Sequence, residues 1–159
     1  MIKWMLCASI MCASLIIGTK MERHYIKRAA YFNMFLEFVR HAEREILFLK
    51  VDILTIINEY IKTMNNAPIE VFNEARSCIT KGEQVKISVA YLNENERCQT
   101  ANFFNGISKL TNDQNKYFRV HENELLEKID LVNKQKKEKG ELGKKLCILV
   151  GIVLVIVII

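Results

Sequence analysis

Hydrophobic residues gather at the two ends of the chain and become periodic between them. An apolar or small stretch runs without interruption from Trp4 to Gly18, and the stretch from Leu146 to Ile159 carries no charge. Between these stretches, apolar residues recur every three or four positions, which is the spacing of one helix face. The pattern predicts an all-α protein, a helical bundle between an N-terminal and a C-terminal transmembrane helix.

This pattern divides the chain into three parts. Residues 1–19 are the predicted first transmembrane helix, residues 20–139 a cytoplasmic helical bundle with basic membrane flanks, and residues 140–159 the second transmembrane helix. The last helix is expected to be long, to start at a Thr111-x-x-Gln114 capping box and to run into the membrane. Gly140 and Gly143 are expected to make it easiest to bend just below the membrane.

Both terminal stretches have a competing interpretation. The first resembles a signal peptide, but bulky residues such as Ile10 and Leu15 stand where a cleavage site needs small ones. The second resembles a buried core helix, but nine of its last ten residues are Val, Ile or Leu, which leaves it no polar face. Its uncharged residues extend about 21 Å of a hydrocarbon core that is about 30 Å thick, so whether they cross it completely stays open.

The bundle is expected to consist of about five to six helices. The first transmembrane helix continues as an amphipathic helix over residues 21–49, and Asp52 is the expected N-cap of a helix over residues 53–64. A third helix starts at Pro68 and ends near residue 81. Asn93 or Asn95 caps a further helix that ends near residue 109.

The stretch from Val85 to Leu92 is ambiguous. Its apolar residues alternate with Lys86, Ser88 and Ala90, which is the period of a strand. Because nothing else in the chain has this period, a strand would have no partner, and the stretch is interpreted as a short helix. The expected core of the bundle consists of Phe32, Leu36, Val39, Leu54, Ile57, Phe72, Phe103, Phe104, Leu125 and Ile129.

Positive charge lies mainly beside the two apolar stretches. The net charge is +5, but residues 51–132 carry nine positive and twelve negative side chains. Under the positive-inside rule, this distribution places the bundle in the cytoplasm and both termini outside the cell membrane. It also argues against a nucleic-acid partner. The flanking basic residues singled out are Lys20, Arg23, Lys27, Arg28, Lys144 and Lys145.

Candidate chemistry is sparse. The three histidines, His24, His41 and His121, are scattered, so no metal ligand set is expected. The run from Gly140 to Lys145 lacks the spacing and the Ser or Thr of a phosphate-binding loop. The five cysteines form neither a disulfide framework nor a CxxC pair. No enzyme activity and no cofactor are therefore expected.

Several short sequence motifs are spread along the whole chain. The residues that carry them are Arg28, Glu43, Glu45, Ile46, Pro68, Phe72, Gln114, Leu146 and Gly151. These motifs and their order resemble the stage III sporulation protein AB family of endospore-forming bacteria. Cys7 and Cys147 stand where the family pattern has Gly.

The resemblance implies a non-enzymatic membrane component of the sporulation channel between mother cell and forespore. It implies a body similar to the cytoplasmic domain of type II secretion platform proteins, on the mother-cell side of the outer forespore membrane. The implied partners of this secretion-like complex are a cytoplasmic secretion-type ATPase and other sporulation-channel proteins. The alternative is a generic two-anchor membrane scaffold, unrelated to sporulation, that forms a homo-oligomer through the apolar face at Phe118, Leu125, Ile129 and Val132.

Overall fold

The protein is all-α, as the sequence predicts. The computed structural model describes residues 2–64, 68–107 and 114–158, and no strand occurs among them. The chain divides into two compact units. One consists of residues 1–29 and 130–159, which we call the helix pair, and the other of residues 30–129, which we call the body. The domain borders predicted at residues 19 and 139 are the expected limits of the membrane-spanning segments. The division into compact units does not test them, so they stay a prediction.

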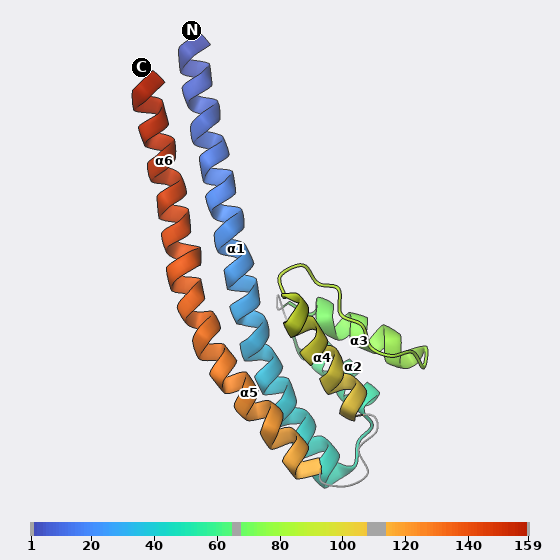
Figure 1. Ribbon diagram of the computed structural model, residues 1–159. Helices are drawn as coiled ribbons and strands as arrows, with labels where there is room; N and C mark the ends of the chain where they lie inside the picture. Colours follow the sequence, from blue (N-terminus) through green and yellow to red (C-terminus); the bar gives the residue numbers. More distant parts are fainter. Residues whose placement is uncertain (1, 65–67, 108–113, 159) are drawn as a thin grey trace. The chain divides into compact units, whose positions relative to one another are not determined.

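The elements follow one another in the order drawn in Figure 1. They are α1 (Ile2–Arg44), a first π-helix (Glu45–Leu49), α2 (Ile53–Thr63), α3 (Glu70–Thr80), α4 (Glu94–Ile107), α5 (Gln114–Gln135), a second π-helix (Lys136–Glu141) and α6 (Leu142–Ile158). From residue 114 to residue 158 the chain is helical without a break. The prediction of long first and last helices is therefore confirmed for the described residues.

Side chains near the start of two body helices satisfy backbone N–H groups that the helix leaves unpaired. Asp52 Oδ2 accepts a hydrogen bond from the N–H of Leu54 at 3.0 Å, which confirms the predicted cap of α2. Asn93 Oδ1 accepts from the N–H of Glu96 at 2.9 Å, and Glu96 Oε2 accepts from the N–H of Asn93 at 3.0 Å. This reciprocal pair is a capping box, and it selects Asn93 over Asn95.

Two expected helix starts have a different outcome. The helix expected to begin at Pro68 begins at Glu70, with Ile69 as its N-cap, so the proline lies just outside it. The expected capping box at Thr111 lies outside the described residues, as does the side chain of Gln114. Only the start of α5 at Gln114 is described.

Aromatic rings form the core of the body. The ring of Phe38 lies 4.8 Å from that of Phe72 and 5.1 Å from that of Tyr60, measured between centroids, and both pairs meet edge to face. Phe35 and Phe103 meet in the same way at 5.2 Å. Such pairs contribute about 0.5–1.5 kcal/mol beyond the burial of their area. The largest completely buried aromatic residues are Tyr31, Phe38, Phe72, Phe103, Phe104 and Phe118.

Most of the expected core is buried, but one helix face was predicted wrongly. Leu54 and Ile129 are only half-buried, whereas the other expected core residues are buried. In α2, the buried residues are Ile53, Ile56, Ile57 and Tyr60. At 3.6 residues per turn the apolar residues of α2 lie within an arc of about 160°, with Leu54 at one edge and Ile56 at the other. The Ile56 side of this arc packs, and periodicity alone does not show which edge will be buried.

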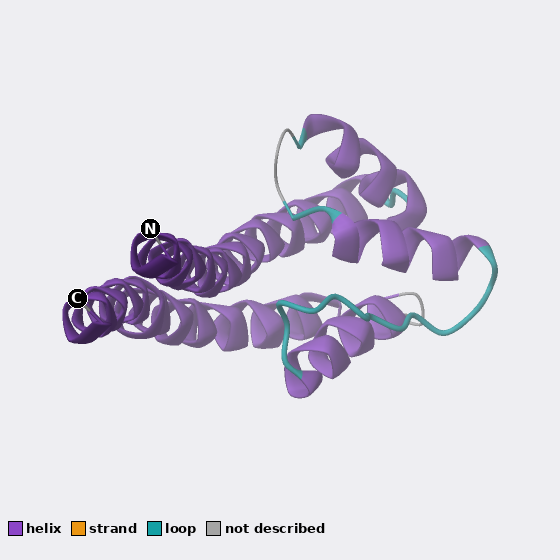
Figure 2. Ribbon diagram, turned by 90° about the horizontal axis from the view of Figure 1, so that it is seen from above, coloured by secondary structure: helices purple, strands orange, loops and turns teal. Residues whose placement is uncertain are grey.

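Residues 84–92 are not helical, and the prediction of a short helix there is wrong (Figure 2). Val85, Ile87, Val89 and Tyr91 are buried, and the residues between them are exposed. The alternation of period two was therefore a real signal for an extended chain with one buried side. The objection that a lone strand lacks a partner does not hold, because side chains of neighbouring helices bind its backbone.

Two polar side chains take the place of a neighbouring strand. Asn105 Oδ1 accepts from the N–H of Val85 at 2.8 Å, and Asn105 Nδ2 donates to the carbonyl of Val85 at 3.3 Å. Glu74 accepts from the N–H of Ser88 at 2.7 Å and from its hydroxyl at 2.6 Å. Asn105 belongs to α4 and Glu74 to α3, so the extended segment is held by the helices on either side of it in sequence.

We predict that replacing Asn105 by Ala destabilises the body by about 1–3 kcal/mol, because the N–H and C=O of buried Val85 lose their partner. Urea unfolding of the full-length protein in mild detergent, followed by circular dichroism, measures this loss. Asn102→Ala is the matched control, because Asn102 is exposed on the same helix. Equal effects of the two substitutions would show that the Asn105 amide does not hold the segment.

Candidate functional site

The helix pair carries both of the predicted membrane-spanning stretches. The first part of α1 and α6 lie side by side and run in opposite directions, with both chain termini at the same end of the pair (Figure 1). The stretch of α1 that starts at Trp4 has the length and mean hydropathy, 1.5, to cross a membrane, and no other helix among the described residues meets both conditions. α6 has 17 described residues.

Glycines bring the two helices close together within the apolar part of the pair. A Cβ atom placed on Gly151 would lie 2.3 Å from Ser14 Oγ, which is too close for any side chain. A Cβ atom placed on Gly18 would lie 3.4 Å from the Cβ of Cys147. Small residues of this kind are typical of helix contacts in membranes, where packing rather than hydrophobic burial drives association.

The same contact face continues beyond the apolar stretches. A Cβ atom on Gly143 would lie 2.8 Å from Met21 Cε, and one on Gly140 would lie 3.3 Å from the Cβ of Tyr25. Packing therefore gives these two glycines a role that the sequence did not reveal. Gly140 also lies in the second π-helix. Easier bending at these residues stays a prediction.

Polar groups join the two helices at three levels. Ser14 Oγ donates to the carbonyl of Cys147 at 3.2 Å, which satisfies a hydroxyl inside an apolar environment. Lys144 Nζ and Glu22 Oε2 form an ion pair at 2.8 Å. Arg28 Nη1 donates to Gln135 Oε1 at 2.6 Å. These contacts and those of the glycines fix one antiparallel register.

The predicted basic flanks therefore separate into two groups. Lys144 and Arg28 make contacts inside the helix pair. The other four, Lys20, Arg23, Lys27 and Lys145, are exposed. The sequence identified all six by their position beside the apolar stretches, but periodicity alone did not show which would point toward the other helix.

Along the two uncharged stretches, the outer surface of the pair is apolar. Trp4 is 72% exposed and Ile16 55% on α1, and Leu146 is 65% and Val157 77% exposed on α6. An apolar hollow between the helices is lined by residues including Ala13, Ile17, Val150 and Leu154. A contiguous apolar surface of this extent marks contact with lipid or with another protein.

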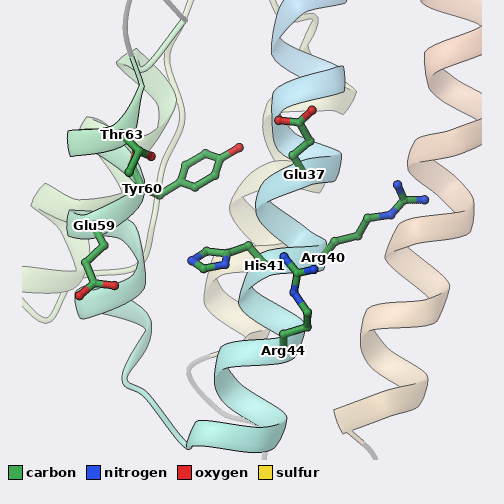
Figure 3. Close-up of a pocket in the computed structure, with 7 residues that line it drawn as sticks. All are labelled: Glu37, Arg40, His41, Arg44, Glu59, Tyr60 and Thr63. Carbon is green, nitrogen blue, oxygen red and sulfur yellow. The ribbon is translucent and has the colours of Figure 1, made fainter.

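The body carries a hollow of about 520 Å³ that opens to solvent between α1 and α2. Figure 3 shows the side chains that line it, which are Glu37, Arg40, His41 and Arg44 from α1 and Glu59, Tyr60 and Thr63 from α2. Both signs of charge occur, so the hollow suits ion pairs and hydrogen bonds. No group of three or more His, Cys, Asp or Glu side chains placed to hold a metal ion occurs in the described part of the chain.

Several lining residues already have partners. Arg40 Nε donates to Glu122 Oε1 at 2.7 Å, and the His41 ring stacks on that of Tyr60 with centroids 6.2 Å apart. Burial, with a smaller contribution from the charge of Glu37, raises the pKa of Tyr60. Its hydroxyl therefore stays protonated and donates to the carbonyl of Met34 at 2.9 Å. These contacts make the wall of the hollow rigid.

The family-motif residues are spread over both units. Glu43, Glu45 and Ile46 are half-buried at the junction of α1 and the first π-helix, where Glu45 lies 3.9 Å from His41. Phe72 belongs to the core, and Gly151 to the contact face of the helix pair. The remaining motif residues take separate places: Arg28 in α1, Pro68 before α3, Gln114 at the start of α5 and Leu146 exposed on α6.

Sequence reasoning missed the residues of α1 that contact the second helix. Ser14, Gly18, Glu22 and Tyr25 recur every three or four positions, which places them on one helix face. Small or polar residues on one face of a membrane-spanning helix were the available signal. It was hidden because the stretch was assessed for apolar content alone.

Comparison with known proteins gives one match. A family model described as stage III sporulation protein AB matches residues 3–159 and so covers nearly the whole chain. No curated protein and no solved structure matches the chain significantly.

We predict that Gly18→Cys forms a disulfide with Cys147, because the 3.4 Å between the two Cβ positions is near the lower limit for such a bond. The variant is made with the other four cysteines replaced by Ala, oxidised in membranes, denatured in sodium dodecyl sulfate and then treated with a maleimide-polyethylene glycol, which finds no free thiol. The control is Ile16→Cys, which lies on the outer face of the same helix. Two free thiols in both variants would contradict the register of the pair.

Proposed function

The chain belongs to the stage III sporulation protein AB family, which implies a role in sporulation, and on this premise we propose that it is a non-enzymatic, two-pass membrane component of the sporulation apparatus. Its body then acts as an assembly platform on the cytoplasmic side, in contact with a secretion-type ATPase. The observation that carries the membrane part of this proposal is the register of the helix pair.

That register supports a second membrane crossing. Gly151 lies against Ser14, and Cys147 against Gly18, so both α6 residues share a level with the apolar stretch of α1. If that stretch lies in hydrocarbon, the α6 residues beside it lie there as well. Both segments are helices, so each bonds its own backbone N–H and C=O groups internally, as a crossing of the lipid requires.

The charged end of the pair supports the orientation. The ion pair between Glu22 and Lys144 lies where both apolar stretches end, and the exposed Lys20, Arg23 and Lys145 lie close to it in sequence. Lys and Arg beside membrane helices favour the cytoplasmic side. Both termini, at the opposite end of the pair, then lie outside.

Contact with an ATPase is proposed from the family resemblance, and the body offers a surface that suits it. Phe48 is 79% exposed and Leu49 66%, at the end of the first π-helix. Phe is enriched at protein interfaces, and exposed apolar side chains that lie together mark interaction sites. Arg44, one turn earlier, lines the polar hollow and is exposed too.

The alternative, a scaffold that self-associates through the last helix, is less well supported. Phe118 and Val132 are 0% exposed and Leu125 7%, so these residues already pack within the chain. Only Ile129 of the proposed self-association face is partly exposed. This observation favours the platform.

We predict that a membrane-impermeant maleimide labels Cys98, which is exposed, only after cells are permeabilised. A cysteine added after Ile159 is labelled in intact cells, because α6 carries the C-terminus across the membrane. A cytosolic protein with an exposed cysteine controls for leakage. Protection of both cysteines in intact cells would leave one crossing and refute the two-pass topology.

A photo-crosslinking amino acid at Phe48 is predicted to capture the ATPase of the sporulation apparatus in sporulating cells, whereas one at exposed Lys81 captures much less. Phe48→Ser combined with Leu49→Ser should lower sporulation at least tenfold with unchanged protein level, because the anchors of the interface are lost. Normal sporulation of this double variant, with crosslinks only between copies of the chain, would support the scaffold instead.

A further inference from the structure

Cations at the charged end of the helix pair point in two directions. Lys144 points toward α1, where it pairs with Glu22. Lys20 and Arg23 are exposed and lie three residues apart, so they are neighbours on one helix face. That face is turned away from the second helix, because Gly18, Glu22 and Tyr25 make the helix contacts.

Lys145 brings a third exposed cation to the same level. Lys144 lies beside two residues of α1. A Cβ atom placed on Gly18 would lie 3.4 Å from the Cα of Lys144, and Glu22 is the ion-pair partner of Lys144. The neighbouring Lys145 is therefore level with Lys20, and it is exposed. The carboxylate at this level, that of Glu22, is already paired with Lys144. The three exposed cations thus form one tier of positive charge, which we call the inner tier.

A second tier lies farther from the apolar stretches and is of mixed charge. Lys27 is seven residues beyond Lys20, or about 10 Å along the helix. Lys139 lies near the same level, because the adjacent Gly140 contacts Tyr25. The exposed carboxylates of Glu138 and Glu141 also belong to this part of the chain. Exposed Lys137 lies in this part as well, so positive charge continues into the second tier, but exposed carboxylates partly cancel it. In the inner tier, directly beside the apolar surface, the carboxylate of Glu22 is already paired with Lys144.

We propose that Lys20, Arg23 and Lys145 bind the phosphate groups of anionic phospholipids at the cytoplasmic surface of the membrane. This inference rests on the proposed function, in which both helices cross the membrane. The tier lies where the apolar surface ends, at the depth of the phosphates in the head-group layer. The protein thus selects lipids with a net negative head group, since a choline or ethanolamine head group adds a cation that the tier repels.

The three side chains have different parts in this binding. Arg23 presents a planar fork that binds two phosphate oxygens at once. Lys20 and Lys145 have flexible stems that lie along the apolar surface while their ammonium groups reach the head groups. The ion pair of Glu22 and Lys144 fixes the level of the two helices, and with it the common level of Arg23 and Lys145 along the pair.

The test measures lipid selectivity of the full-length protein in phosphatidylcholine vesicles that contain trace spin-labelled lipid. Electron paramagnetic resonance gives the fraction of labelled phosphatidylglycerol or phosphatidylcholine immobilised by the protein. We expect phosphatidylglycerol to be preferred several-fold at low salt, since basic residues beside a membrane attract anionic lipid. The preference should fall to about onefold in the combined variant Lys20→Gln, Arg23→Gln, Lys145→Gln.

The matched control is Lys62→Gln with Lys81→Gln and Lys86→Gln, which removes the same charge from exposed lysines of the body. It should keep the preference. Unchanged selectivity in the inner-tier variant, or an equal loss in the control, overturns the inference. Displacement of phosphatidylglycerol by millimolar inorganic phosphate, beyond the effect of an equal ionic strength of chloride, would assign the tier to a soluble anion and overturn the lipid source.

Extraction of the vesicles with alkaline carbonate separates this result from the proposed function. If the protein is released, the helices are not inserted, and the two-pass membrane proposal itself fails. If the protein stays inserted and shows no preference for phosphatidylglycerol, only the lipid inference fails.

Discussion

Close packing between α1 and the last helix is the constraint on which the membrane-directed part of the structure depends. Gly18 and Gly151 let the two helices approach, and the pair of Glu22 with Lys144 fixes their level. Steric fit and polar contacts of this kind determine register in a way that apolar surface cannot, because Val, Ile and Leu pack similarly at many offsets. The proposals of a second membrane crossing and of a lipid-binding tier both rest on that register.

The body is stabilised by different means. Aromatic rings from α1, α2, α3, α4 and α5 meet in its core, and their geometry is specific because edge-to-face contacts orient each ring. Buried polar groups are paired within it. The hydroxyls of Tyr31 and Thr100 lie 2.8 Å apart, and Thr100 also donates to the carbonyl of Glu96. Burial without pairing would cost each group free energy, so these contacts add specificity to the core.

The segment between α3 and α4 shows how a non-helical chain with alternating buried side chains is held in a helical protein. Its apolar side chains enter the core, as they would beneath a sheet. The amide of Asn105 and the carboxylate of Glu74 then supply the hydrogen bonds that a second strand would have made. A sequence search for strand pairs has no means to detect such partners, since they are single residues on helices.

The sequence by itself determined the helical class, the long first and last helices, the cap at Asp52 and most of the core. These features follow from local signals: periodicity, capping chemistry and the contrast between apolar and charged stretches. The sequence also identified the basic residues that lie beside the two apolar stretches.

Only the tertiary structure decided which edge of the apolar side of α2 packs, that residues 84–92 are not helical, and which flanking cations turn toward the second helix. The physical reason is that each of these outcomes depends on a partner distant in the chain. Lys144 and Lys145 are chemically alike, and Glu22, 122 residues before Lys144, distinguishes them.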